Sequence, residues 1–549
     1  MIPRPLLSVF VLSAAALPAA AQSPAVPPAP VAFEVFADSE LEPYLRTLQN
    51  VGLVGAHPWS VRQFSATQVR AMAAAGASHP WEDWFDFRAG GSDQAYEYGW
   101  IGADARTIYN SSFPWGGNDG PLWAGRGMTG ALSAGAHARL GPVRFVLAPV
   151  AFMAQNKAFG LAPLEPDATS EFQSELTPLY VDLPQRFGPD TYGRVDWGNS
   201  SLALDAAGLS LGISNAAQHW GPTDRHPLIL GSNSGGFAHA FLETVHPLDL
   251  WMGEIHGRYM VGRLEQTGWV NERSLVGPRR SGTGFAVTFM PRGLEGLEIG
   301  MTRFFHREWP EGGIGRSEIL QPLEAIFKNS ISDADQRAPD NQLASLFARW
   351  NFAAAGVEVW GEFIRQDHSV NARALAVEPD DLSGYTLGFR RVWNDEGQGG
   401  LSVLRAESTI TTNSHRERGG ARIRDSAFNG QPYYQHAPFV QGHTQRGQLL
   451  ASPAGHGGHG LVVGWDRYDS RGRWSVEFER RLQRDRTTGI AGEKAAVADV
   501  FYALGGSVLH FAEAWDVEVA GHGVYNLNRY LHSDQFNLNL AATVRMPFR

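Results

Sequence analysis

The sequence predicts an all-β protein, a transmembrane antiparallel β-barrel of about 18 strands with a small N-terminal helical head. Three observations support this fold class. Most of the chain after Gly130 alternates apolar and polar residues, as a strand with two different faces does. Short turns that contain glycine or proline alternate with long polar connections, which is the layout of an outer-membrane barrel. The N-terminus has the features of a secretory signal.

Residues 1–21 are expected to direct secretion and to be removed. Arg4 supplies a positive charge, residues 6–17 are mostly apolar, and the alanines at 19–21 satisfy the small-residue rule for cleavage before Gln22. A transmembrane anchor is the alternative, but this apolar stretch is shorter than the roughly 20 residues that a helical span needs. Residues 22–37, rich in proline and alanine, are expected to form an extended linker.

Residues 38–95 predict a small helical head, which we expect on the periplasmic side. Ser39 and Glu42 have the spacing of a capping box, and an apolar stripe at helical spacing follows them as far as Val51. Gly52 can then end this helix in a left-handed conformation.

A second capping box, Ser65 with Gln68, predicts another helix that runs to Gly76. Phe64 and Val69 occupy the two positions of a hydrophobic staple around that box. Because isolated helices of this length are marginally stable, both should pack on each other or on a larger body. The His-Pro-Trp sequences at 57–59 and 79–81 are interpreted as turn and packing residues.

The barrel is predicted to occupy residues 96–549. In the segment 473–482, Trp474, Val476 and Phe478 oppose Ser475, Glu477 and other polar residues, and many such segments approach the roughly 9–11 residues of a membrane-spanning strand. The other predicted strands are 131–140, 143–153, 200–205, 207–214, 236–244, 253–261, 282–290, 296–305, 343–353, 356–366, 383–392, 399–409, 434–442, 459–467, 501–511, 513–523 and 537–548. The predicted long connections are 155–190, 306–342, 367–382, 411–433 and 484–500.

A soluble β-sandwich or propeller would also alternate, with its apolar faces turned towards another sheet. The secretory signal, the absence of cysteine and the alternating final strand favour the barrel. In a membrane the sheet must close, because an open edge would leave backbone groups without water. The final strand departs from the usual outer-membrane ending, since Phe548 is penultimate and follows Pro547.

Composition excludes several classes of protein. With no cysteine, the chain has no disulfide scaffold, thiolate metal site or thiol nucleophile. A formal net charge of −10 argues against general nucleic-acid binding, which needs a basic field. Arginine greatly outnumbers lysine; this composition suits an acidic polymer, although a GC-rich genome would produce the same bias.

Several sequence motifs resemble those of the capsule assembly Wzi family. In the head these are residues 44–49 (YLRTLQ), 58–60 (PWS) and 79–81 (HPW). A longer series, residues 198–202, 211–214, 218–222, 228–233 and 236–239, carries GNSSL, LGIS, QHWGP, LILGSN and GFAH. The resemblance implies an outer-membrane barrel with a periplasmic helical head, which binds capsular or exopolysaccharide in a lectin-like way. The chain departs from the family pattern at His219, where a second tryptophan is common.

The segment 198–239 contains the candidate polysaccharide-binding residues. Trp220 could stack on the apolar face of a sugar, and Asp224, Arg225, His226 and Asn233 could hydrogen-bond hydroxyls or uronate carboxylates. The alternative is that this segment folds into the lumen as a plug with Trp220 buried, and the two interpretations are compatible.

No motif predicts a cofactor, a metal or a catalytic group. The GxGxxG match at 125–130 leads into an alternating strand instead of a helix, which argues against a dinucleotide site. His456 and His459 in a glycine-rich loop are interpreted as loop residues. We therefore expect a non-enzymatic protein with polysaccharide and outer-membrane lipid as partners and no nucleic acid, its oligomeric state being open. A diffusion porin and an outer-membrane barrel enzyme are the alternatives.

Overall fold

The structure is a computed structural model that describes residues 29–30, 34–37, 39–73, 78–88, 96–164, 168–174, 181–270, 277–324, 340–366, 383–395, 399–411, 433–434, 441–455, 457–490, 493–530 and 533–546. The predicted signal at 1–21 and the chain end at 547–549 lie outside these residues, as does His456. Most of the predicted linker also lies outside them, but β1 (Ala29–Pro30) and β2 (Glu34–Val35) are described.

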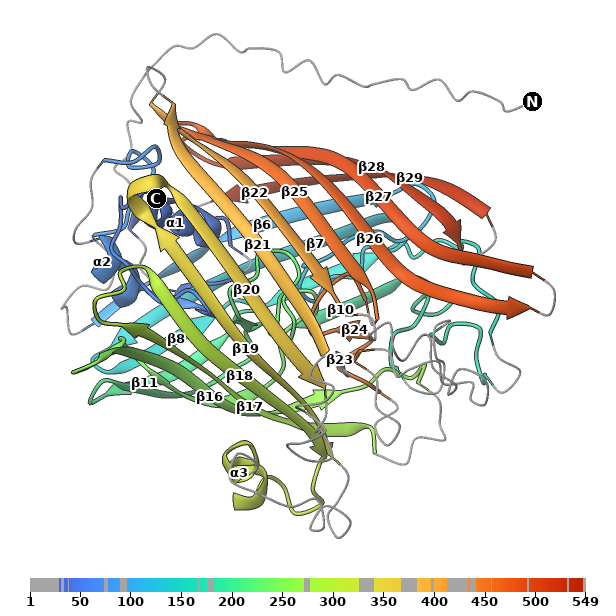
Figure 1. Cartoon of the computed structure of the whole chain (residues 1–549), viewed down its shortest axis with the longest axis horizontal. Coiled ribbons are helices and arrows are strands. Elements are labelled where there is room, and N and C mark those ends of the chain that lie inside the picture. The colour runs from blue at the N-terminus through green and yellow to red at the C-terminus, as the bar shows by residue number, and fades with distance from the viewer. Residues whose placement is uncertain are drawn as a thin grey trace.

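One sheet closes into an 18-stranded antiparallel barrel within the described chain, which confirms the predicted fold class (Figure 1). Its segments are β6 (Tyr96–Asn110), β7 (Gly127–Leu140), β8 (Val143–Leu147), β9 (Val150–Ala154), β10 (Tyr192–Asp196), β11 (Ser201–Ala206), β12 (Leu209–Ser214), β14 (His239–Thr244), β15 (Leu248–Leu250), β16 (Gly253–Glu265), β17 (Arg279–Pro291), β18 (Leu297–Glu308), β19 (Asp340–Phe352), β20 (Val357–Gln366), β21 (Ser383–Asp395), β22 (Gly400–Ile410), β25 (His459–Asp469), β26 (Gly472–Ile490), β27 (Glu493–Phe511), β28 (Asp516–Arg529) and β29 (Ser533–Met546). Three strands are interrupted, because β8 continues into β9, β10 into β11, and β14 into β15. The pairing of β29 with β6 completes the circle.

Each strand turns one face to the lumen and the other outwards. On β26, Glu477 and Glu479 are buried inside, whereas Val476 is 47% exposed on the outer wall. Leu538 and Leu540 on β29 are likewise exposed on the outer wall. The alternation predicted for 473–482 and 537–548 is therefore confirmed for the described residues, and the outer wall carries the apolar face that a lipid-facing barrel needs.

Aromatic side chains gather towards both ends of the outer wall. Those beside the short turns are Trp251, Trp350, Phe352, Trp393, Trp465 and Trp515, and those towards the other end are Phe363, Tyr385, Tyr502, Tyr525 and Phe536. Tyr525 stands opposite both Tyr502 and Phe536 in the register of the sheet. Two aromatic girdles around an apolar band are typical of outer-membrane barrels. None of the helices in the described part of the chain is long and apolar enough to cross a membrane.

The two ends of the barrel differ in their connections. Tight turns join the strands at one end: 141–142, 207–208, 251–252, 292–296, 353–356, 470–471 and 512–515. At the other end the strands are joined mostly by long connections, among them 111–126, 155–191, 215–238 and 411–458. This asymmetry agrees with the predicted layout of short turns and long connections.

The predicted head helices are α1 (Leu41–Asn50) and α2 (Ala66–Ala73), and they lie at the short-turn end (Figure 1). Gly52 ends α1 at φ +71° with the double hydrogen bond of a Schellman motif, as predicted. The first capping box was wrong: the hydroxyl of Ser39 donates to the carbonyl of Phe36, and α1 has no side-chain cap. The Glu42 carboxylate instead accepts the indole N–H of Trp59 at 2.5 Å.

The second capping box is present. Gln68 accepts the backbone N–H of Ser65 at 2.7 Å, and the Ser65 hydroxyl accepts the N–H of Gln68 at 3.3 Å. The short pair β2 and β4 (Phe64–Ser65) leads into this helix. The apolar sides of both helices belong to one buried cluster that includes the wall residues Val392, Leu401, Val403, Tyr468, Leu509 and Phe511. The barrel therefore contributes to the larger body that such short helices need.

Both tryptophans of the His-Pro-Trp sequences, Trp59 and Trp81, are fully buried, which agrees with a packing role. Trp81 donates to the carbonyl of Gly472 at 3.1 Å, and Trp84 donates to that of Ser470 at 2.6 Å. These bonds join the head to the turn between β25 and β26. The pair β1 and β5 (Phe85–Asp86) completes this part of the chain.

A third helix, α3 (Arg316–Glu324), lies in the predicted connection 306–342 and packs against β17 and β18 (Figure 1). Arg303 points outwards from β18 and donates to the carbonyl of Pro322 at 3.3 Å and to Gln342 at 2.6 Å. The helix therefore covers a guanidinium that would otherwise face lipid, where an unpaired charge is unfavourable.

Two expectations about individual strands were wrong, and a third lies mostly outside the described residues. The strand β6 was not among the predicted strands, because its glycines and charges interrupt the alternation. The segment 484–500, predicted as a loop, belongs largely to β26 and β27, which extend beyond their neighbours at the long-connection end. Of the predicted strand 434–442, residues 435–440 lie outside the described residues, and Tyr434, Gln441 and Gly442 are in turn and irregular structure. A small hairpin of β23 (Thr444–Gln445) and β24 (Gln448–Leu449) follows.

Candidate functional site

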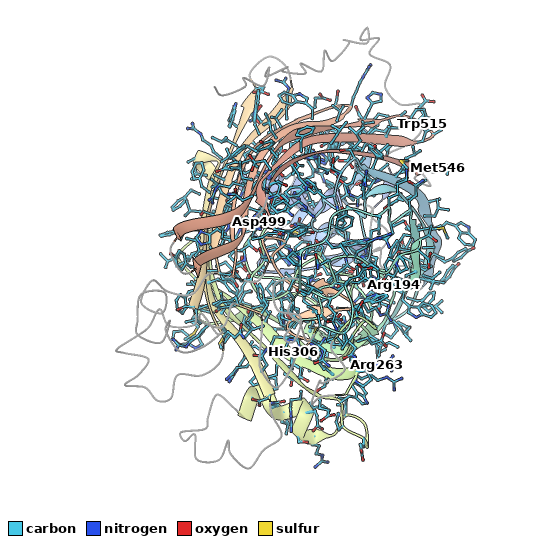
Figure 2. All side chains as sticks on the ribbon, turned by 90° about the vertical axis from the view of Figure 1, so that its right-hand side faces the viewer. Arg194, Arg263, His306, Asp499, Trp515 and Met546 are labelled. Carbon is cyan, nitrogen blue, oxygen red and sulfur yellow. The ribbon has the colours of Figure 1, made fainter. Side chains whose placement is uncertain are left out.

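Three long connections turn into the barrel and form a body that we call the lumen plug: residues 111–126, 215–238 and 441–455. The N–H of Gly120 donates to the carbonyl of Ser232 at 2.8 Å, and the N–H of Gly231 donates to that of Leu450 at 2.8 Å. Viewed from the long-connection end, the ring of strands surrounds an interior crossed by chain and packed with side chains (Figure 2). The lumen is therefore substantially filled.

The plug has its own apolar core, in which Trp220 is fully buried. Its ring lies 6.3 Å from that of Phe304 on β18, and Leu228, Ile229 and Leu230 belong to the same cluster. Trp220 also lies on the short strand β13 (His219–Trp220), which pairs with β3 (Val61–Arg62) of the head. In this structure Trp220 is a packing residue, which is the alternative that the sequence left open.

One carboxylate of the barrel wall anchors the plug. Glu407 on β22 accepts the backbone N–H groups of Asp224, Arg225 and His226 at 2.6, 3.0 and 2.8 Å. It also accepts the indole N–H of Trp360 at 3.2 Å. Consecutive backbone N–H groups that surround one carboxylate form strong, charge-assisted hydrogen bonds, so Glu407 fixes the loop that carries the candidate binding residues.

Two further wall carboxylates hold the head. Glu298 on β18 accepts the backbone N–H groups of Trp59 and Ser60, both at 2.9 Å. Glu358 on β20 is fully buried and pairs with Arg46 of α1, whose Nε lies 3.0 Å away, and with Arg349 of β19 at 2.9 Å. Glu298 lies two residues from the short turn 292–296 and Glu358 two residues from the short turn 353–356, so the head occupies the mouth of the barrel at that end.

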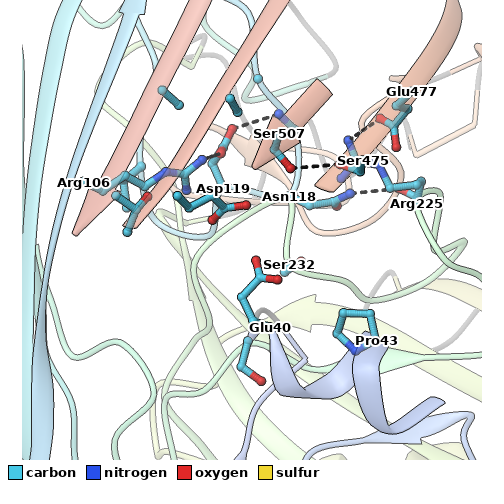
Figure 3. Close-up of a pocket in the computed structure, with 18 of the residues that line it drawn as sticks. Glu40, Pro43, Arg106, Asn118, Asp119, Arg225, Ser232, Ser475, Glu477 and Ser507 are labelled. Carbon is cyan, nitrogen blue, oxygen red and sulfur yellow. Dashed lines mark hydrogen bonds and ion pairs between the residues drawn. The ribbon is translucent and has the colours of Figure 1, made fainter. Parts of the chain in front are cut away.

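A cavity of about 500 Å³ remains between the head, the plug and the wall, and we call it the lumen cavity (Figure 3). It is strongly charged with both signs. Its arginines are Arg62, Arg106, Arg225, Arg390, Arg405, Arg473, Arg481 and Arg545, and its carboxylates are Glu40, Glu42, Asp104, Asp119, Asp224, Asp466, Glu477, Glu479 and Glu518. Hydroxyl, amide and aromatic groups between them come from Trp115, Tyr468, Ser475, Ser507, Asn539 and Thr543.

Asp224 and Arg225 are the two predicted site residues that line this cavity. Asp224 pairs with Arg390 at 3.0 Å; burial alone would raise the pKa of its carboxyl, but the guanidinium groups of Arg390 and Arg46 hold that pKa well below its usual range. Arg225 pairs with Glu477 at 3.2 Å, and this neighbour raises the pKa of the guanidinium. Both side chains are therefore ionised where a polar ligand could meet them.

The other predicted site residues hold the plug together. His226 is fully buried, and its Nδ1 lies 3.1 Å from the Ser452 hydroxyl. Asn233 donates to the carbonyl of Leu449 at 3.1 Å and accepts the N–H of Asn118 at 3.3 Å. These two residues join separate segments of the plug to one another.

Sequence reasoning missed the wall and head residues that complete the site, in particular Arg62, Arg390, Arg405 and Glu407. The only sequence signal for Arg390, Arg405 and Glu407 is their place in the predicted strands 383–392 and 399–409. Such alternation identifies a polar face but not which of its members meet across the lumen.

Buried histidines should make the plug sensitive to acid. Burial lowers the pKa of His226 to about 4 and that of His443 to about 3, so both are neutral when the plug is folded at pH 7. The unfolded chain binds their protons below about pH 6.5, so stability should fall as the pH drops from about 6.5 towards 4, by at most about 1.4 kcal/mol per pH unit for each histidine.

Thermal unfolding of the detergent-solubilised protein between pH 8 and 4.5 measures this loss. His226→Gln should flatten the profile, whereas His510→Gln, at an exposed position of β27, should leave it unchanged. Equal profiles for all three proteins would contradict the assignment.

The sequence matches the profile of the family described as capsule assembly protein Wzi over residues 124–515. Among solved structures, the fold is similar to that of Wzi from Escherichia coli, an outer-membrane protein involved in group 1 capsule assembly and described as a carbohydrate-binding β-barrel. The two chains are 12% identical with a TM-score of 0.63, over 94% of this chain and 100% of that one. OccK2 (OpdF) of Pseudomonas aeruginosa is 10% identical with a TM-score of 0.39, over 83% of this chain and 98% of its own. A search of curated protein sequences finds no match.

Proposed function

This chain belongs to the capsule assembly protein Wzi family, and we propose that it binds capsular or extracellular polysaccharide at the outer membrane and helps to assemble and retain it there. The family match, which spans most of the barrel, carries this proposal. The apolar outer wall and its aromatic girdles support the location in a membrane. The filled lumen supports a binding role in place of a transport role.

The long-connection end is the part of the barrel that we propose to meet the polymer. Asp224 and Arg225 line the lumen cavity and are proposed to contact sugar units of the polymer that enter it, while Trp220, His226 and Asn233 position the loop that carries them. Their packing in the plug supports this division of roles. Each contact would be weak, and repeats along one polymer would supply avidity. No catalytic step is part of this proposal.

Deletion of the protein is the direct test. We expect a deletion strain to release surface polysaccharide into the medium, measured as the ratio of cell-bound to free polymer after gentle washing. Complementation with the full chain should restore retention, and complementation with Arg225→Ala should restore less, because one cationic contact per protein is lost. Retention that stays unchanged on deletion would contradict the proposed function.

The filled lumen makes a further prediction against the porin alternative. The purified barrel in a planar lipid bilayer should give no large steady conductance, because the plug occupies the lumen and the head occupies the short-turn mouth. A porin of comparable strand number serves as the positive control. A persistent open-channel current from the wild-type protein would favour the diffusion porin.

A further inference from the structure

Arginines from three distant parts of the chain meet at the head side of the lumen cavity. Arg62 comes from β3 of the head, Arg390 from β21 and Arg473 from β26, and all three line the cavity. Arg62 and Arg390 are only 2% exposed. Arg62 donates to the carbonyl of Thr223, and Arg390 donates to the adjacent Asp224 carboxylate at 3.0 Å, so one turn of the plug brings these two together.

Only some of the N–H donors of these guanidinium groups have hydrogen-bond partners. Nε of Arg62, Nε and Nη1 of Arg390 and Nε of Arg473 are buried and have no hydrogen-bond partner among the residues that the structure describes. Buried donors are nearly always satisfied, and charged donors left unpaired are especially unfavourable. The side chains that carry these vacant donors line the cavity, so a carboxylate that enters it lies beside these arginines.

The positive charge of Arg62 is incompletely balanced. Burial lowers the pKa of the Arg62 guanidinium, and attraction by Glu42 and Asp224 does not restore it because Arg46 and Arg390 repel the same charge. The salt-bridge distance from Arg62 to Glu42 is 3.5 Å, longer than a good charge-assisted bond. An added anion would therefore be attracted to Arg62 and Arg390 together.

The remainder of the cavity suits a hydroxylated molecule. The hydroxyls of Ser475 and Ser507 bond to each other at 2.9 Å, and Asn539 and Thr543 also line the wall. Trp115 adds an aromatic surface on the plug side. A volume of about 500 Å³ lies within the range of about 300–1,000 Å³ for small-molecule sites, and it accommodates one or two sugar units but not a polymer.

We propose that the lumen cavity binds a small sugar acid, its carboxylate held by Arg62 and Arg390 and its hydroxyls by the serine and asparagine side chains of β26, β27 and β29. Guanidinium groups bind carboxylates through paired N–H donors, and Asp224 keeps Arg390 oriented for this. The proposal rests on the proposed function only for the choice of a sugar as ligand. The protein would then have two kinds of site: a surface that holds the polymer, and an internal site for a single acidic sugar.

Isothermal titration of the full chain in detergent tests this site with glucuronate, glucose and inorganic phosphate. We expect glucuronate to bind and glucose and phosphate not to bind under the same conditions. Arg390→Gln should weaken glucuronate binding at least tenfold. Arg292→Gln, at a short turn where the side chain is 60% exposed, should bind as the wild type does.

Because Arg390→Gln leaves Asp224 unpaired and can impair folding, a second variant fills the cavity without removing a charge. Ala520 lines the cavity from β28, and Ala520→Phe should abolish glucuronate binding while the heat-modifiable gel shift of the folded barrel is retained. Absence of glucuronate binding by the wild type, or unchanged binding by folded Ala520→Phe, would overturn the site. Equal binding of phosphate would overturn its assignment to a sugar acid. Polymer retention by the deletion strain is a separate measurement. It tests the proposed function, whereas glucuronate binding to the purified protein tests the lumen cavity.

Discussion

Replacing Glu407 by alanine is expected to free the plug from the barrel wall and to convert a silent barrel into a conducting one. The carboxylate is 3% exposed and holds three consecutive N–H groups of residues 224–226 together with the Trp360 indole. Hydrogen bonds to a charged group contribute roughly 1.5–3 kcal/mol each, and the donors left behind have no access to bulk water. The free energy that holds the plug against the wall should therefore fall by several kcal/mol. The other contacts of residues 224–226 are not expected to replace this loss.

Planar-bilayer conductance and thermal unfolding measure this effect. Glu407→Ala should show frequent open-channel events and a lower unfolding midpoint, and Glu407→Gln should be intermediate because its amide oxygen still accepts hydrogen bonds. Glu254→Ala is the control, since that carboxylate lies on β16, a different strand of the same barrel, and is exposed. A silent Glu407→Ala barrel with an unchanged midpoint would show that the plug is held elsewhere.

Local signals in the sequence predicted the fold well. Alternation between Trp474 or Val476 and Glu477 is a property of one strand, and the end of α1 at Gly52 depends on residues within one turn. The wrong capping box at Ser39 shows the limit of such signals. Glu42 bonds to Trp59 instead, and the local spacing of residues 39–42 gives no sign of this more distant partner.

The site could be predicted only in part, for the same reason. The sequence predicts that the segment 198–239 carries the binding residues, with a lumen plug as the alternative for the same segment. Its partners come from far along the chain: Glu407 is separated from Arg225 by 182 residues, and Arg62 from Thr223 by 161. Which lumen-facing residues of an 18-stranded barrel meet across its interior depends on how the plug folds. A single strand's periodicity does not encode that arrangement.

Glu358→Ala is expected to produce the largest loss of stability at the short-turn end. Glu358 is fully buried between Arg46 and Arg349, and Asn50 also donates to it. Removing one partner of a buried ion pair typically costs about 3–5 kcal/mol, because the opposite charge is left buried and uncompensated. In this variant Arg349 retains its ion pair with Glu298, at 3.4 Å, but Arg46 no longer has a carboxylate partner. The head should therefore detach from the barrel mouth more often.

Limited proteolysis measures this detachment, with cleavage in residues 39–88 expected many times faster in Glu358→Ala than in the wild type. Asp249→Ala removes an ion pair with Arg292 in which both side chains are at least 60% exposed, and it should change the rate little because exposed pairs contribute about 0–1 kcal/mol. The double variant Arg46→Met with Glu358→Leu separates charge from contact, since it replaces the pair by apolar groups of similar size. If uncompensated charge is the cause, this double variant should be cleaved more slowly than Glu358→Ala. Equal cleavage of the two would instead assign the loss to the hydrogen bonds with Asn50 and Arg349.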